Sequence, residues 1–159
     1  MNHVLEGLAL ELGLAEPNNE RLRLDFAYAC AERVRHLLEE PSVVGCLDVL
    51  GRFLHGQARR EVLEAAKREA AALANRHQGS KSIDGCGHAA VSATYAVAKA
   101  LEGKALEAAS YAAYAAVYAQ GGSAAVADRE SFETEFSWQA MALGELAGKA
   151  HLAVNASRS

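Results

Sequence analysis

The cysteine and histidine in residues 82–88 are the first candidates for chemistry in this chain. Thiolate and imidazole are good zinc ligands, so Cys86 and His88 are the candidate metal ligands, and a thiol near a helix N-terminus can be reactive. A structural zinc site needs four ligands, usually in spaced pairs, and the sequence contains no CxxC, HxxxH or HExxH. The structural interpretation is therefore preferred: Asp84 caps a helix, and the two flanking glycines allow a tight turn before it. We predict no cofactor and no resident metal.

The other histidines are spread along the chain: His3, His36, His55, His77 and His151. Three of them, His36, His55 and His77, lie near predicted helix C-terminal ends, where the helix dipole favours a donor or a cation. Capping is the preferred interpretation. A helical bundle can also bring three histidines together from three helices, so a metal- or small-ligand-binding bundle stays open as the alternative function.

Carboxylates are concentrated in residues 128–136. Asp128 and Glu135 are seven residues apart and Glu130 and Glu133 are three apart, so each pair shares one face of a predicted helix. Such pairs suit a basic partner or a divalent metal, but a di-metal bundle also uses Glu-x-x-His motifs, which this sequence lacks. The preferred interpretation is structural, because the helix dipole favours carboxylates at the start of a helix. If the run has a function, partner binding is favoured over metal, and Asp128, Glu130, Glu133 and Glu135 are the candidate partner-binding residues.

Three tyrosines recur at helical spacing, Tyr111, Tyr114 and Tyr118, and Tyr95 lies on the preceding predicted helix. Rows of this kind usually form core or a helix–helix seam, with the hydroxyl groups at the edge. A binding groove is the alternative. Trp138 is expected to pack in a similar way.

The sequence has no nucleophile elbow GxSxG, no Walker phosphate loop and no GxGxxG between a strand and a helix. No nucleophile–base pair is evident, and we predict no catalytic residues. The chain is therefore expected not to be an enzyme, and its function is expected to lie in a surface or a groove.

The elements that carry these residues are predicted to be helices. Alanine is the commonest residue and proline occurs only at Pro17 and Pro41, a composition that favours helix. Apolar spacing and Gly or Pro breaks predict helices over residues 5–12, 20–40, 43–55, 58–75, 84–102, 105–120 and 128–154. We predict an all-α fold, a single compact bundle of six or seven mostly antiparallel helices. One domain spans residues 1–159, with a short helix and turn over 1–18 and a frayed tail over 155–159.

The overall charge and the cysteines narrow the class of protein. A formal net charge of −4 argues against a nucleic-acid-binding protein. The three cysteines are odd in number and lack CxxC spacing, which indicates a reducing compartment. No signal peptide and no 18-residue lipid-grade span is evident, so we expect a cytoplasmic protein that does not enter a membrane.

Residues 24–34, Pro41, residues 46–56 and the Ala- and Tyr-rich helices over 92–118 carry a resemblance to a known family. The chain resembles the alanine-rich helical immunity proteins of bacterial polymorphic toxin systems, the immunity-five-like group, over residues 22–118. This resemblance implies a non-catalytic protein-binding module that neutralises a cognate toxin by occluding its active site. The acidic run would suit a basic toxin. Homo-oligomerisation through the alanine or tyrosine seams is a further alternative.

Overall fold

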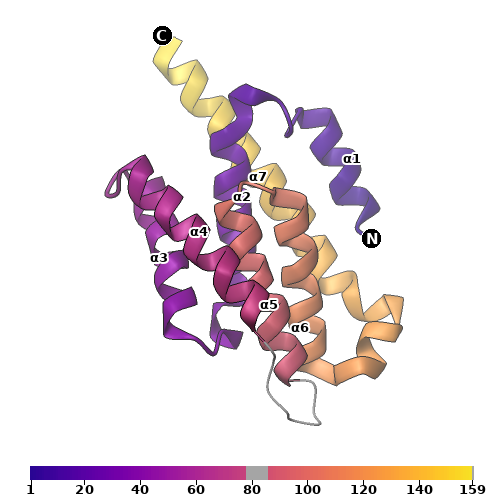
Figure 1. Ribbon diagram of the computed structural model, residues 1–159. Helices are drawn as coiled ribbons and strands as arrows, with labels where there is room; N and C mark the ends of the chain where they lie inside the picture. The colour runs from indigo at the N-terminus through magenta and orange to yellow at the C-terminus, as the bar shows by residue number, and fades with distance from the viewer. Residues whose placement is uncertain (78–85, 159) are drawn as a thin grey trace.

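The computed structural model describes residues 1–77 and 86–158, and this part of the chain is helical with no strand. The α-helices are α1 (His3–Leu12), α2 (Glu20–Arg33), α3 (Pro41–Leu54), α4 (Arg60–Arg76), α5 (Cys86–Leu101), α6 (Ala105–Ala127) and α7 (Glu133–Arg158). Three short 3-10 helices join them, η1 (Pro17–Asn19), η2 (Arg35–Leu37) and η3 (Arg129–Phe132). The predicted all-α bundle is confirmed (Figure 1).

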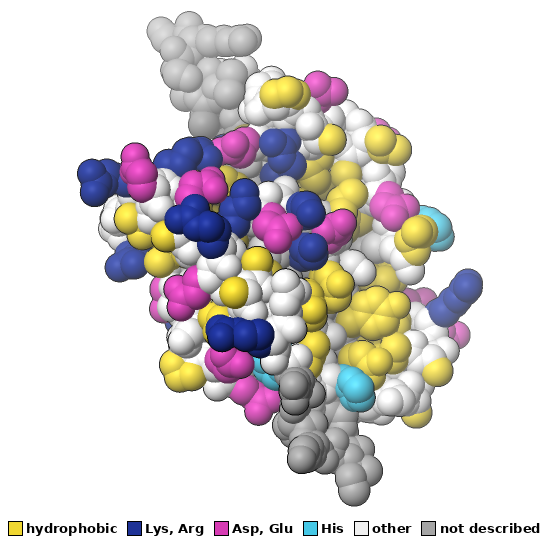
Figure 2. All heavy atoms as spheres, in the orientation of Figure 1, with side chains coloured by type: hydrophobic (Ala, Val, Ile, Leu, Met, Phe, Trp, Pro, Cys, Tyr) yellow, Lys and Arg dark blue, Asp and Glu magenta, His cyan; other side chains and the backbone are white. Residues whose placement is uncertain are grey.

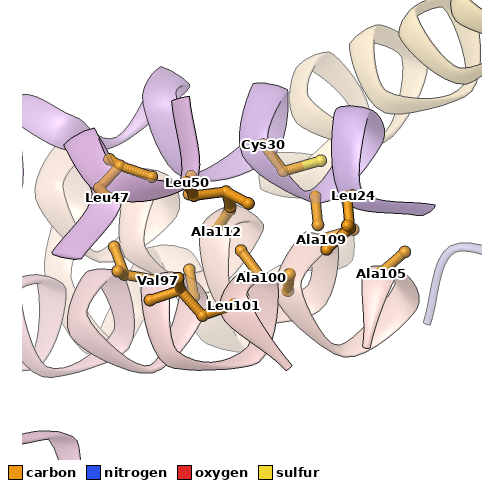
Figure 3. Packing of buried hydrophobic residues seen from close by; sticks show 14 of the residues in the cluster. Leu24, Cys30, Leu47, Leu50, Val97, Ala100, Leu101, Ala105, Ala109 and Ala112 are labelled. Carbon is orange, nitrogen blue, oxygen red and sulfur yellow. The ribbon is translucent and has the colours of Figure 1, made fainter. Parts of the chain in front are cut away.

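The antiparallel pair α5 and α6 forms the centre of the bundle (Figure 1). Helix α2 packs against both of them, α3 and α4 lie on one side, and α1 and α7 lie on the other. Small side chains allow this close packing, because Ala100, Ala105, Ala109 and Ala112 line the contact surfaces of α5 and α6 (Figure 3). Larger side chains from α2, α3 and α5, among them Leu24, Leu47 and Val97, fill the space between (Figure 3).

The chain between α2 and α3 differs from the prediction of one helix over residues 20–40. Helix α2 ends at Arg33, and Val34 leaves the helical backbone with φ −113° and ψ 13°. Val34 is itself buried, and the following η2 packs Leu37 and Leu38 against the core. A continued straight helix would carry these two leucines along the α2 axis, so the break serves core packing.

Asn19 caps a different helix from the one that its position predicts. It precedes α2, but its side chain makes no cap hydrogen bond there. Its Nδ2 donates to the carbonyl oxygens of Gly13 at 2.7 Å and Leu12 at 3.3 Å, at the C-terminal end of α1. Gly13 has φ +64°, the left-handed conformation that ends many helices. Asn19 therefore occupies the N-cap position of α2, but its side chain caps the end of α1.

Helix α6 changes direction at Gly122, inside the predicted break over residues 121–123. Gly122 has φ +63° and ψ −152°, a backbone conformation that is open almost only to glycine. The segment beyond it leads through η3 into α7, so α7 begins at Glu133 rather than near Asp128. This segment has a small hydrophobic cluster of its own, in which Phe132 packs against Ala113 and Val117. Helix α7 then continues to Arg158, beyond the predicted end near residue 154.

Two of the cysteines, Cys30 and Cys46, are free thiols in the core. Burial raises the pKa of the Cys30 thiol. Burial, helped by the Glu69 carboxylate, raises the pKa of Cys46 from 9.0 to about 11. Because the thiolate forms only as the pH approaches the pKa, a raised pKa lowers the thiolate fraction of Cys46 at pH 8 by about a hundredfold.

We therefore expect both thiols to resist alkylation in the folded protein at pH 8. The measurement is labelling with iodoacetamide followed by peptide mapping, and the same sample unfolded in about 6 M guanidinium is the positive control. Labelling of Cys30 or Cys46 in the native state as fast as in guanidinium would contradict their burial.

Within residues 1–77 and 86–158, none of the helices combines the length and the apolar character that a bilayer crossing requires.

Candidate binding site

A cleft lies where the N-terminal end of α1, α6, η3 and α7 meet. Its volume is about 720 Å³. Four elements contribute side chains to its lining. These side chains are Asn2, His3 and Glu6 at α1, Leu106, Ser110 and Tyr114 on α6, Arg129 and Phe132 in η3, and Phe136 and Gln139 on α7. The cleft therefore depends on the change of direction at Gly122, which brings η3 back toward α6.

A buried amide holds the inner wall of the cleft in place. Gln139 is 2% exposed, and its Nε2 donates to the Ala109 carbonyl oxygen of α6 at 2.8 Å. Its Oε1 accepts a hydrogen bond from Asn2 Nδ2 at 3.3 Å. Asn2 in turn caps α1, because its Oδ1 accepts from the backbone N–H of Leu5 at 3.1 Å. One glutamine thus connects α1, α6 and α7.

Aromatic rings form the apolar part of the cleft. Tyr114 is 42% exposed and meets Phe132 edge to face, with 5.2 Å between the ring centroids. Phe132 also packs against Phe136, with 5.3 Å between the ring centroids. The three rings come from α6, η3 and α7, so they fix the positions of these elements relative to one another.

The aromatic surface continues from the cleft along the outer seam of α5 and α6. A second hollow of about 360 Å³ shares Ser110 and Tyr114 with the cleft. Tyr95 of α5 stacks on Tyr111 of α6 with centroids 5.2 Å apart. We call the cleft and this second hollow together the aromatic groove. Figure 2 shows hydrophobic side chains gathered over α6, beside a group of mixed charges.

These contacts divide the tyrosine row. Tyr95, Tyr111 and Tyr118 are half-buried and lie in the helix–helix seam, as predicted. Tyr114 instead faces the cleft and is exposed there, as the alternative interpretation of a binding groove requires. Trp138 is partly buried against the core, as expected.

Charged side chains close the end of the groove at the turn between α5 and α6. Lys99 Nζ lies 3.6 Å from a Glu107 oxygen and 3.8 Å from a Glu102 oxygen. Lys104 pairs with Glu102 at 3.2 Å. These mutually paired charges leave little net charge at this end.

Exposed carboxylates lie next to the η3 residues that line the cleft. Asp128, Glu130 and Glu133 are exposed in and beside η3, where Arg129 is the neighbouring cation. Asp128 also caps η3, because its Oδ1 accepts from the Glu130 N–H at 3.1 Å. Glu6 stands on the α1 wall, 3.7 Å from His3 Nδ1. We call Asp128, Glu130 and Glu133 the acidic rim.

Glu135 does not belong to this rim, and its prediction as an exposed partner-binding residue is corrected. It is 6% exposed and forms a two-pronged ion pair with Arg33 of α2. The Arg33 Nε–Glu135 Oε2 distance is 2.7 Å and the Nη2–Oε1 distance is 3.3 Å. The Arg33 guanidinium also lies 4.3 Å above the Trp138 ring. Asp128 and Glu135 do not share a helix face, because Asp128 precedes η3 and Glu135 lies in α7.

Of the two candidate metal ligands, only His88 has a described side chain. His88 is exposed on α5 and stacks on Tyr118 with centroids 5.2 Å apart. Cys86 is the first residue of α5, and residues 78–85, including Asp84, lie outside the described residues. No group of three or more His, Cys, Asp or Glu side chains with metal-binding geometry occurs within the part of the chain that the structure describes. His55 and His77 occupy helix C-cap positions, and His55 Nδ1 lies 2.7 Å from the Gly51 carbonyl oxygen.

Neither family models, nor curated proteins, nor solved structures give a match to this chain. The resemblance to immunity proteins therefore stays a prediction, and the case for function depends on the geometry of the aromatic groove.

Proposed function

We propose that this chain is a non-catalytic protein-binding module that holds a basic protein partner in the aromatic groove. The observation that carries the proposal is a cleft of about 720 Å³ in which the exposed Tyr114 ring packs on the buried Phe132, with the exposed carboxylates of the acidic rim next to its η3 wall. Protein interfaces commonly have an apolar, aromatic centre and a polar rim.

The rings suit this role because they offer large contact areas at a small cost in side-chain entropy. Tyr114 has its ring half in solvent and its edges supported by Phe132. Phe136 forms the adjacent wall. Tyrosine and tryptophan side chains held in such positions are frequent hot spots of binding energy.

The charges indicate the class of partner. The three carboxylates of the acidic rim and Glu6 of the cleft wall outnumber the nearby cations, the Arg129 guanidinium and the α-amino group of Met1. A basic partner would be attracted to these carboxylates and oriented by them, since charges at an interface rim act mainly on association rate and specificity.

The resemblance to immunity proteins supports a toxin as that partner. In this proposal the chain acts in the bacterial cytoplasm and covers the active site of a basic toxin, such as a nuclease. The two free, buried thiols are compatible with a reducing compartment.

The test is affinity capture from the host lysate, followed by titration calorimetry with the purified partner. We expect one dominant basic protein, whose activity the chain inhibits. Tyr114→Ala should weaken binding about thirtyfold, the typical loss for an aromatic hot spot. The double variant Glu130→Lys, Glu133→Lys should weaken it at least about tenfold, with the difference shrinking at high salt.

The matched control is Glu39→Lys, Glu61→Lys, which makes the same change in net charge at two exposed positions outside the groove. Its affinity for the partner should stay within about twofold of the wild-type value, which is the size of a nonspecific charge effect. The proposal is wrong if the partner binds both Tyr114→Ala and the Glu130→Lys, Glu133→Lys variant as it binds the wild type, or if no partner is captured.

A further inference from the structure

The outer face of α7 in its C-terminal half carries exposed apolar side chains that no other described element covers. Helix α7 leaves the bundle there and projects past the other helices (Figure 1). Leu143 is still fully buried, whereas the described side chains from Gly148 onward are exposed.

The position of each side chain around the helix defines this face. An α-helix turns about 100° per residue, so Gln139, Leu143 and Leu146 share the side that faces the core. Met141 and Leu152 lie on the opposite side, with Gly148 between them. Met141 is 55% exposed and Leu152 is 68% exposed, so two large apolar side chains stand on one solvent-facing stripe.

Two glycines make the backbone of this stripe accessible. Gly144 and Gly148 lie in helix without the positive φ that requires glycine, and a Cβ atom at either position would meet nothing within 4 Å. Glycine is a poor helix former, so the fold of one chain gains nothing from it here. A bare backbone does allow a second helix to approach closely.

We propose that this face of α7 binds the same face of a second copy of this chain, as an antiparallel helix pair. A two-fold axis midway between residues 146 and 147 places Met141 of each chain opposite Leu152 of the other. The same arrangement sets Glu145 of each chain near Lys149 of the other, because the same flanks of two antiparallel helices face each other. One axis therefore pairs both the apolar and the charged residues.

The charges are available for this contact. Glu145 and Lys149 are both exposed, and neither makes an ion pair with another described residue. The face is separate from the aromatic groove, which α7 lines with its N-terminal residues Phe136 and Gln139. The proposal thus stands independently of the protein-binding function.

The contact is short, because residues 141–152 span about 16 Å of helix. Interfaces at the small end of the size range are weak, so the dimer should form at micromolar concentrations. Sedimentation equilibrium from about 5 to about 500 μM should show the mass rising from 16.8 kDa toward twice that value. A monomer at every concentration would overturn the proposal.

Variants test the face and its register. Leu152→Glu should abolish association, and Glu145→Lys or Lys149→Glu alone should weaken it about tenfold by placing like charges together. An equimolar mixture of these two single variants should associate at least as well as the wild type, because every cross-pair is then attractive. Leu10→Glu, at an apolar position of α1 that is 84% exposed, is the control and should dimerise normally.

Circular dichroism will show whether each variant keeps its helix content. Dimers that are unaffected by Leu152→Glu would show that this face is not the interface. If both single variants lose the dimer and their mixture does not restore it, the antiparallel register is excluded. Each single variant is measured alone and in the mixture. A folding defect in either chain would persist in the mixture, so recovery of association there cannot come from a change in folding.

Discussion

Replacing Glu135 by alanine is expected to lower the free energy of unfolding by about 3 kcal/mol, the lower end of the range for breaking a buried ion pair. Glu135 is almost fully buried and accepts two hydrogen bonds from the Arg33 guanidinium. Without it, Arg33 keeps its charge beside the Trp138 ring with no counter-ion. The side chain of Arg33 is 32% exposed, so solvent screens part of this loss and the upper end of the range is not expected.

Urea unfolding followed by circular dichroism measures this effect. The double variant Arg33→Met, Glu135→Met is the control, since it removes both charges and should recover about half of the loss or more. Glu133→Ala, two residues away and exposed, should change stability by less than about 0.5 kcal/mol. A loss below about 1 kcal/mol for Glu135→Ala would mean that the pair does not hold α2 to α7.

The misplacement of Glu135 shows what a sequence pattern leaves undetermined. In the sequence it is one of several similar carboxylates, and its partner Arg33 is 102 residues away. Which carboxylate turns inward depends on where α7 begins. The helix starts at Glu133 after η3, so a prediction that started it near Asp128 wrongly placed Glu135 on the same exposed face as Asp128.

Features set by local backbone chemistry were predictable. The breaks at Pro41 and within residues 121–123 follow from proline at the first position of α3 and from the left-handed conformation of Gly122. The break after Arg33 was not predictable, because Val34 and its neighbours carry no turn signal. The chain bends there to pack Leu37 and Leu38 against the core. Tertiary packing decided that helix end.

The cleft is a property of the assembled bundle. Tyrosine spacing and the acidic run drew attention to α6 and to residues 128–136 from the sequence alone. Asn2 and Gln139 were missed, although they join the three helices around the cleft. The available signal was a lone glutamine on an otherwise apolar helix face, which becomes informative only when its partners on α1 and α6 are known.

The turn that builds the cleft leads to the second large effect. Gly122→Ala is expected to lower the free energy of unfolding by about 2 kcal/mol, because φ +63° with ψ −152° is strained for any residue with a Cβ atom. The segment that follows should also shift, since it is held mainly by the small cluster around Phe132. The acidic rim would move with it, so partner binding should weaken further than the stability loss alone explains.

Urea unfolding and partner titration on the same variant separate the two effects. Gly7→Ala is the matched control: Gly7 lies within α1 with open space around it, so alanine there should stabilise the protein by up to about 1 kcal/mol. A Gly122→Ala protein as stable as the wild type would show that α6 can pass through this point without the left-handed turn. If it is destabilised yet binds its partner normally, the acidic rim contributes little to recognition, and the aromatic rings on α6 and α7 must supply most of it.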